Sequence, residues 1–317
     1  MKLYIKVNDL KTIKNLNELL NPHFSKFEPL FNSNIHPKYK FYYYAIKEIL
    51  NKQHYFYDNR KLKKIIKGIY FGNSYCEHLL PEPIDVIKAY SYFRDIHHNF
   101  VYVFPPVSEN KIDKAKEILD ELKRLNIKEV VVNDFGLLQL AKDDFKVILG
   151  INFTKTIKNV FLDSKEPLEI SSIQQKQQKE LISHLEYEID LLREFYKNLN
   201  ISRISIENKL YNLSFLEKKP LMYVDVYYPN SIISYSRSCD IAGVFNDKQT
   251  YFPVSYCKKF CLKTSLTFED SKILNLHQDY NAIYKPYFKL ELPEIVYKNK
   301  KNRLIWEIFW VSKKYWK

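Results

Sequence analysis

The sequence predicts an α/β protein built on a closed parallel barrel of the (β/α)8, or TIM, type, which need not be regular. Short runs rich in β-branched and aromatic residues alternate with longer amphipathic stretches, the order expected when helices connect parallel strands. These strand-like runs number eight, which is the strand count of that barrel. A doubly wound open sheet is the alternative.

The predicted elements follow one another along most of the chain. The strands are predicted near 2–6, 67–71, 99–104, 128–133, 146–150, 167–170, 203–206 and 221–227. Helices are predicted near 84–95, near 109–125 with Ser108 as a cap, and near 176–199. The last of these carries one apolar stripe, formed by Leu181, Leu185, Ile189, Leu192 and Phe195.

We expect residues 1–261 to form the barrel domain, with a helical insertion at 21–66 that contains a Tyr-rich helix at 40–52. Residues 262–317 are expected to form a C-terminal extension packed on the barrel. This extension contains the basic run Lys298–Arg303 and the tryptophans Trp306, Trp310 and Trp316. A chain of 317 residues is long enough for one such large domain.

The chain is basic, with a formal net charge of +13. Such a charge suits nucleic acid or anionic small molecules, so tRNA and rRNA are candidate partners, although it also fits a Lys-rich composition on solvated helix faces. No apolar run approaches the ~18 residues of a membrane span, and the N-terminus lacks the apolar segment of a signal peptide. We therefore expect a cytoplasmic protein, in which clustered cysteines are more often metal ligands than disulfides.

Four cysteines supply enough thiols for one metal centre. Cys239, Cys257 and Cys261 lie in one segment, and Cys76 lies far upstream after the second predicted strand. Cys239 follows the eighth predicted strand, which neighbours the first strand in a closed barrel, so the thiols can meet at one rim. From the residues alone, an iron–sulfur cluster and a zinc site are equally favoured, and inert buried cysteines are the third interpretation.

Polar residues at predicted strand ends are Asn133, Asp134, Asn152, Glu169 and Glu207. Asp134 and Glu169 are candidate catalytic acid/base groups, and Asn133 is a candidate for orienting a substrate. Asp134 also suits the N-cap of a helix over FGLLQLA. His78 is a candidate ligand or proton donor, or an ordinary loop residue. The sequence contains no nucleophile elbow, HExxH or P-loop pattern.

The segment KEVVVNDFGLLQLAKDDFKVILGINF resembles the strand, Asn/Asp-x-Gly, helix, strand, Gly-x-Asn core of the collagenase-like peptidase family U-32. The segments KGIYFGNSYC, PLEISS, RISIE and MYVDVYYPNSIISYSRSC extend the resemblance over roughly residues 64–265. One early cysteine followed by a late triplet is most similar to the iron–sulfur members involved in oxygen-independent ubiquinone or RNA hydroxylation.

This resemblance implies a 4Fe–4S cluster held by Cys76, Cys239, Cys257 and Cys261, with zinc as the alternative. It also implies oxidative modification, such as hydroxylation, of an aromatic or RNA substrate, and a second family member as a heterodimer partner. The alternatives are a non-catalytic cluster-binding accessory subunit, a peptidase and a structural zinc protein.

Overall fold

The computed structural model describes residues 1–10, 12–13, 48, 66–94, 99–154, 189–208, 222–246, 257–267, 276–287, 290, 292–307 and 314–316. Nearly all of the predicted insertion 21–66, including the predicted helix at 40–52, lies outside these ranges, and so does the predicted strand at 167–170. Over the described ranges, no helix is both long enough and apolar enough to cross a membrane.

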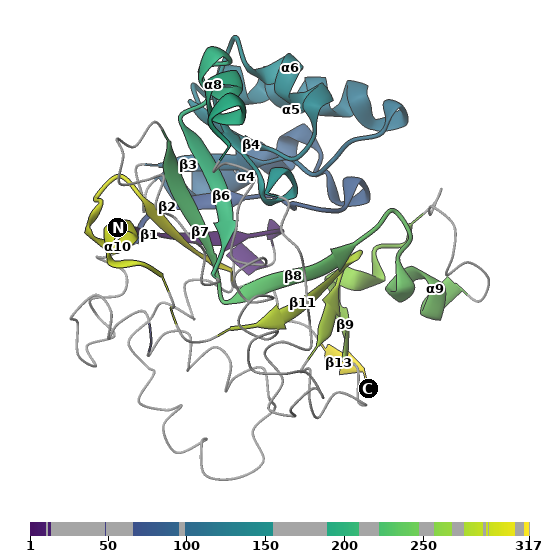
Figure 1. Ribbon diagram of the computed structural model, residues 1–317. Helices are drawn as coiled ribbons and strands as arrows, with labels where there is room; N and C mark the ends of the chain where they lie inside the picture. The colour runs from purple at the N-terminus through teal and green to yellow at the C-terminus, as the bar shows by residue number, and fades with distance from the viewer. Residues whose placement is uncertain are drawn as a thin grey trace, which may run out of the picture.

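Eight strands close into a barrel with helices between them, which confirms the predicted (β/α)8 fold class (Figure 1). Every neighbouring pair of strands runs parallel. Around the barrel the strands are β1 (Lys2–Val7), β12 (Arg303–Glu307), β7 (Tyr223–Tyr228), β6 (Arg203–Glu207), β5 (Lys146–Leu149), β4 (Glu129–Val132), β3 (Phe100–Val103) and β2 (Ile66–Phe71). Nearly all of their residues are buried, as expected for strands that are covered on both faces.

The eighth strand of the barrel differs from the prediction. The ring of strands is complete without residues 167–170, and β12 fills the place between β1 and β7. The barrel therefore does not end at residue 261, because part of the predicted C-terminal extension is a barrel strand. Trp306, which sequence analysis assigned to that extension, is fully buried in β12.

Helices cover the outside of the barrel, as the amphipathic stretches predicted. They are α4 (Pro83–Arg94), α5 (Ile112–Arg124), α6 (Phe135–Ala141) and α8 (Asp190–Asn198). In α5, Ala115, Ile118 and Leu122 are spaced by three or four residues and are all buried. Ser108 does not cap this helix through its side chain, because a turn of 3-10 helix, η4 (Glu109–Lys111), comes before α5.

A second sheet of five strands adjoins the barrel (Figure 1). Its order is β13 (Lys314–Trp316), β9 (Thr264–Thr267), β10 (His277–Asp279), β11 (Ala282–Pro286) and β8 (Asn230–Tyr235). The Glu207 carboxylate at the end of β6 accepts a hydrogen bond of 2.6 Å from the Ile232 backbone N–H, which holds β8 against the barrel. The helices α9 (Asp240–Asn246), η8 (Phe260–Leu262) and α10 (Glu294–Lys298) complete this part of the chain.

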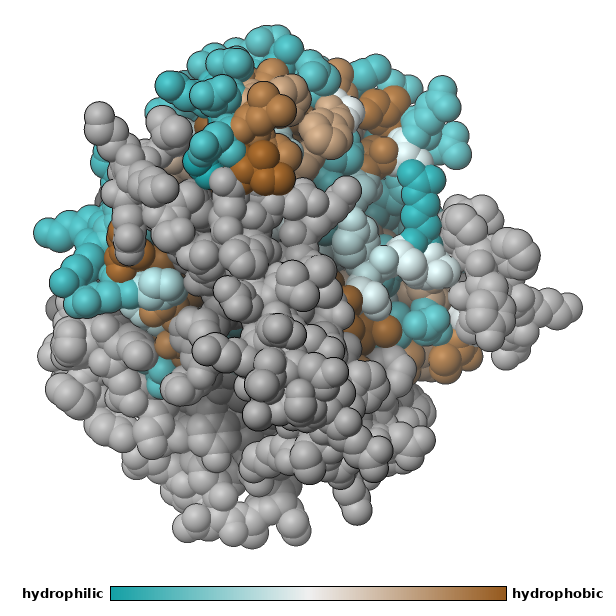
Figure 2. Space-filling view, in the orientation of Figure 1, coloured by the Kyte–Doolittle hydropathy of each residue, from teal (hydrophilic) through white to brown (hydrophobic). Residues whose placement is uncertain are grey.

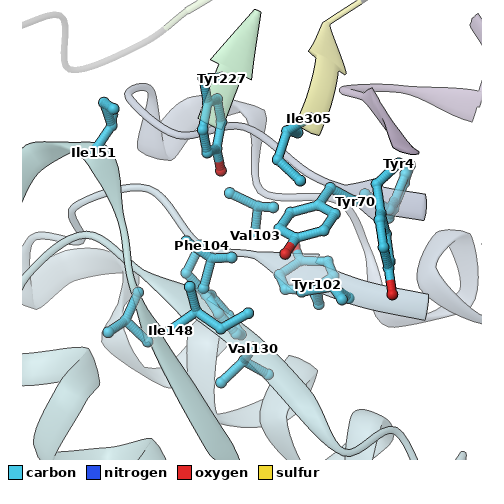
Figure 3. Close-up of a cluster of buried hydrophobic side chains, with 14 of the residues drawn as sticks. Tyr4, Tyr70, Tyr102, Val103, Phe104, Val130, Ile148, Ile151, Tyr227 and Ile305 are labelled. Carbon is cyan, nitrogen blue, oxygen red and sulfur yellow. The ribbon is translucent and has the colours of Figure 1, made fainter. Parts of the chain in front are cut away.

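The interior of the barrel is filled by aromatic and aliphatic side chains that point toward one another (Figure 3). Charged groups occupy the amino end of this interior. The Arg303 guanidinium donates to both carboxylate oxygens of Glu129, at 2.8 and 2.9 Å. Arg203 pairs with Asp225 at 2.6 Å, and the Tyr70 hydroxyl also donates to Asp225. The charges that the strands bring inside are therefore paired with each other.

A third ion pair, between Lys6 of β1 and Glu307 of β12, lies toward the carboxyl end and is fully buried. The ammonium of Lys6 is 3.0 Å from the Glu307 carboxylate and donates to the Ser74 hydroxyl at 2.8 Å. Lys6 and Glu307 are each only 1 % exposed. Burial lowers the pKa of Lys6 and raises the pKa of Glu307, and the attraction between the two charges opposes both shifts. Each group therefore depends on the other to stay charged.

Removing one partner of this pair should be costly. We expect Glu307→Leu to lower the free energy of unfolding by about 3–5 kcal/mol, because Lys6 loses its counter-charge in the interior, and either a lone buried charge or the loss of its proton costs free energy. The double variant Lys6→Met/Glu307→Leu should recover most of this loss, since no isolated charge remains. Asp85→Asn, which breaks the exposed pair with Lys88, should cost less than about 1 kcal/mol. Urea denaturation measures all three, and equal losses for the single and double variants would contradict the interpretation.

Candidate functional site

A cavity of about 620 Å³ lies at the carboxyl end of the barrel. Its walls come from the loops that follow β2, β4 and β5, from α8, and from the chain that follows β8. All four cysteines of the chain line it, together with His78, Asn133, Asp134 and Asn152. The structure thus brings the predicted metal-ligating thiols and several of the predicted strand-end residues to one site.

The position of Cys76 is set by a tight turn after β2. Gly72 has φ +123°, and a Cβ added there would lie 2.3 Å from the Val103 carbonyl oxygen, so only glycine fits. The Asn73 side-chain oxygen then accepts hydrogen bonds from the backbone N–H groups of Tyr75 and Cys76, both at 2.8 Å. These bonds turn the chain so that Cys76 stands at the start of the 3-10 helix η3 (Glu77–Leu79).

Backbone N–H groups act on three of the thiols. The Lys259 N–H donates to the Cys257 sulfur at 3.3 Å. Cys76 precedes η3 and Cys239 precedes α9, and backbone groups at these helix starts, of His78 and Leu79 and of Ala242 and Ile241, partly offset the rise that burial causes in the pKa of Cys76 and Cys239. Hydrogen bonds to sulfur stabilise thiolates, and they are one of the features that set the reduction potential of iron–sulfur sites.

Cys257 and Cys261 approach the cavity by an irregular path. The sequence predicts them about one helical turn apart, but Lys259 between them has φ 56° and so interrupts any continuous helix. The 3-10 helix η8 then begins at Phe260, whose ring stacks on Phe245 of α9 at 5.0 Å. This contact ties the segment that carries Cys257 and Cys261 to the helix that follows Cys239.

The thiols of this site affect one another. Burial raises the pKa of Cys76 to about 12, and the neighbouring Cys239 and Cys257 add to the shift. Burial likewise raises the pKa of Cys239 to about 11, with a contribution from Cys257. Several thiolates crowded in a buried site repel one another, and a bound cation would remove that repulsion.

Four thiols are the ligand set of a 4Fe–4S cluster and also of a structural zinc ion. Over the described part of the chain, no group of three or more His, Cys, Asp or Glu side chains is placed to hold one metal ion. A single tetrahedral zinc, with bonds of about 2.3 Å to sulfur, needs its ligands close together. In a cubane cluster each thiolate binds its own iron, so the sulfurs stand further apart.

Asn133 and Asn152 join the loops of the rim to one another. The Asn133 amide donates to the Phe104 carbonyl at 2.7 Å, and its oxygen accepts from the Asn152 backbone N–H at 3.3 Å. The Asn152 amide donates to the Ser74 carbonyl, also at 3.3 Å. A Cβ on Gly150 would lie 2.1 Å from the Asn133 oxygen, which explains the glycine. Asn133 thus has a structural role, and its role toward a substrate stays a prediction.

Asp134 caps α6, as one of the two interpretations predicted. One carboxylate oxygen accepts from the Leu137 backbone N–H at 2.7 Å, and the other accepts from the Val107 N–H at 2.9 Å. Its carboxylate also borders the cavity, so the acid/base role stays a prediction. Glu169, the other candidate acid/base residue, lies outside the described residues.

An apolar wall faces the cysteines across the cavity, and sequence analysis did not identify it as part of a site. Phe135 and Phe153 pack edge to face at 4.9 Å, and α8 adds Leu192, Phe195 and Tyr196. Figure 2 shows hydrophobic surface near the top of the view, where α6 and α8 lie in Figure 1. Helical periodicity placed these side chains on a packing face, and only the fold places them beside the thiols.

The predicted nucleic-acid features do not gather at this site. The run Lys298–Arg303 leads into β12 and therefore lies at the amino end of the barrel, opposite the cysteines. Arg303 is buried against Glu129, and Trp306 is fully buried, so neither is available to an RNA. The other basic run, at residues 60–64, and Trp310 lie outside the described residues.

The environment of the thiols predicts unequal reactivity in metal-free protein. Because burial keeps Cys76 and Cys239 protonated, iodoacetamide at about pH 8 should modify them at least about tenfold more slowly than the partly exposed Cys257. Peptide mass spectrometry over time measures the rates, and unfolded protein is the control in which all thiols react alike. Equal rates for Cys76 and Cys257 in folded protein would contradict this geometry.

The two hydrogen bonds of Asp134 can be separated by mutation. Asp134→Ala should lower the free energy of unfolding by about 2–4 kcal/mol, because it removes both acceptors. Asp134→Asn keeps an acceptor for the Leu137 N–H and should cost about half as much. Urea denaturation measures the difference. A loss below about 0.5 kcal/mol for Asp134→Ala would contradict the capping role.

Comparisons with known proteins assign no family to this chain. No protein-family model, curated protein or solved structure matches it. The resemblance to family U-32 therefore stays a prediction, and the function proposed below is argued from the geometry of the site.

Proposed function

We propose that Cys76, Cys239, Cys257 and Cys261 hold a 4Fe–4S cluster, and that the cavity beside them takes a small flat molecule for oxidative modification. One observation carries the proposal: four thiols from distant parts of the chain line one cavity. The Lys259 N–H donates to the Cys257 sulfur, and backbone groups at the starts of η3 and α9 lower the pKa of Cys76 and Cys239 against the effect of burial.

The residues around the thiols fit a redox centre. When bound, a cluster of this type accepts and gives single electrons. Tyr75 is buried beside Cys76, and its ring packs against those of Tyr235 and Tyr284 at 5.9 and 5.8 Å. The Cys239 thiol is within hydrogen-bonding distance of the Tyr280 carbonyl, at 3.3 Å. These contacts exclude water from the thiols, a condition that affects the reduction potential of an iron–sulfur site.

The cavity favours a small aromatic or apolar substrate over an RNA base. Its volume of about 620 Å³ lies within the range of small-molecule sites. Phe135, Phe153 and Phe195 offer ring faces and edges for a flat molecule. Of the two basic runs that the sequence suggests for RNA binding, Lys298–Arg303 lies at the other end of the barrel, and residues 60–64 lie outside the described residues.

A cavity next to the thiols favours chemistry in this chain over the role of a non-catalytic accessory subunit. The side chains that border the cavity include His78, Asp134 and Arg237. His78 and Asp134 are groups that can hold or move a proton beside a bound molecule, and the Arg237 guanidinium can bind an anionic group. A structural zinc site is the second candidate, because four cysteines are also the ligand set of zinc.

Purification without oxygen tests the proposal. We expect brown protein with about four iron and four sulfide per chain, and a visible absorbance that bleaches with dithionite. Cys257→Ser and Cys261→Ser should lose most of the iron and sulfide, whereas Ser236→Ala, at the same cavity, should keep them. Colourless protein with one zinc per chain would contradict the cluster and support the zinc alternative.

A further inference from the structure

Cys257 is the most accessible of the proposed ligands. It is partly exposed, whereas Cys76, Cys239 and Cys261 are buried. The two residues that follow it, Lys258 and Lys259, are both exposed. The left-handed conformation of Lys259 turns the chain here, and its N–H stays on the Cys257 sulfur at 3.3 Å. Two surface cations thus flank the point at which the site comes nearest to solvent.

Further cations gather around the same point from other parts of the chain. Lys114 forms an ion pair with Glu82. Its hydrogen bond lowers the pKa of Glu82, and the charges of Lys259 and Lys111 lower it further. Arg237 is exposed and lines the cavity with Cys257. We define the basic rim as Lys111, Lys114, Arg237, Lys258 and Lys259.

The acidic groups nearby are mostly held by hydrogen bonds or ion pairs. Glu82 pairs with Lys114. Glu77 and Asp134 line the cavity, where their carboxylates accept hydrogen bonds from backbone N–H groups. Asp240 lies beside Cys239 at the start of α9, and Glu109 is exposed near Lys111. Beside Cys257 the exposed charges of Lys258, Lys259 and Arg237 are all positive, and such a surface attracts an acidic partner and orients it before contact.

We infer that the basic rim docks an acidic one-electron carrier protein, and that the electron enters the site on the side of Cys257. This inference rests on the proposed function, because it needs a redox centre at the cysteines. The reduced carrier loses one electron and the site gains it, and no bond is made or broken at the contact. The observations favour a protein over RNA here, because the cations form a compact group beside the ligands and the cavity walls are largely apolar.

Stopped-flow reduction of the cluster-loaded protein by a reduced flavodoxin, a small acidic flavoprotein, tests the inference. The rate should fall at least about tenfold between about 50 and 500 mM salt, because screening removes the attraction. Lys258→Glu/Lys259→Asn should slow the reaction at least about tenfold at low salt and remove most of the salt dependence. Asn suits the left-handed position of Lys259.

The matched control is Lys2→Glu/Lys300→Asn, which makes the same charge change at exposed lysines of the amino end. The rate at which flavodoxin reduces this control variant should stay within about twofold of the wild-type rate. Reduction by methyl viologen radical, a small cation that needs no docking, should not slow in either variant. Iron and sulfide analysis of each sample comes first, so the absence of a cluster, which would overturn the proposed function as well, is distinguished from failure of docking alone.

Four results would overturn the inference with the cluster intact. The two double variants could lose rate equally, or the wild-type rate could be independent of salt. Flavodoxin could also fail to reduce a site that viologen reduces. Finally, if bulk tRNA at low concentration blocks the flavodoxin reaction in wild-type protein but binds the Lys258/Lys259 variant poorly, the basic rim is a nucleic-acid surface instead.

Discussion

Closure of the barrel by β12 is the constraint on which the rest of the structure depends. β7 and β12 are parallel neighbours, so the chain must leave the carboxyl end of β7 and return to the amino end of β12. Residues 229–302 form this connection, and they include Cys239, Cys257 and Cys261. The connection begins at the carboxyl end of the barrel, where the loop after β2 carries Cys76. The closure of the barrel by β12 therefore also brings the three later cysteines to Cys76.

Side-chain hydrogen bonds to the backbone then fix the rim. Asn73 sets the turn before Cys76, Asn133 holds the loops after β3 and β5, and Glu207 holds β8. The Asn281 amide bridges the carbonyls of Tyr75 and Ser236, at 3.1 and 2.5 Å. Each bond contributes about 1 kcal/mol, but together they hold the loops that carry Cys76 and Cys239. The polar residues near the strand ends thus have a positioning role, whatever chemistry they share in.

The sequence predicted the fold class because strand-forming runs and amphipathic stretches are local signals. It did not predict β12, because the segment RLIWE has a charged residue at each end. The partners of these charges, Glu129 for Arg303 and Lys6 for Glu307, lie far away in the chain. Sequence analysis placed Cys239 directly after the eighth predicted strand, at 221–227, which is β7 of the barrel. In the structure β8, a strand of the second sheet, lies between β7 and Cys239. The cysteines come together through the long connection between β7 and β12, and no short-range sequence pattern predicts the path of that connection. For the same reason the apolar wall from Phe135 and α8 became visible only with the fold.

Whether the converging thiols together bind one iron–sulfur cluster can be measured by X-ray absorption at the iron edge, on protein prepared without oxygen. We expect iron surrounded only by sulfur, with other iron atoms as its next neighbours, and we expect this signal to disappear in the Cys76→Ser variant. Iron bound by oxygen or nitrogen, or a spectrum that Cys76→Ser leaves unchanged, would contradict the proposed cluster.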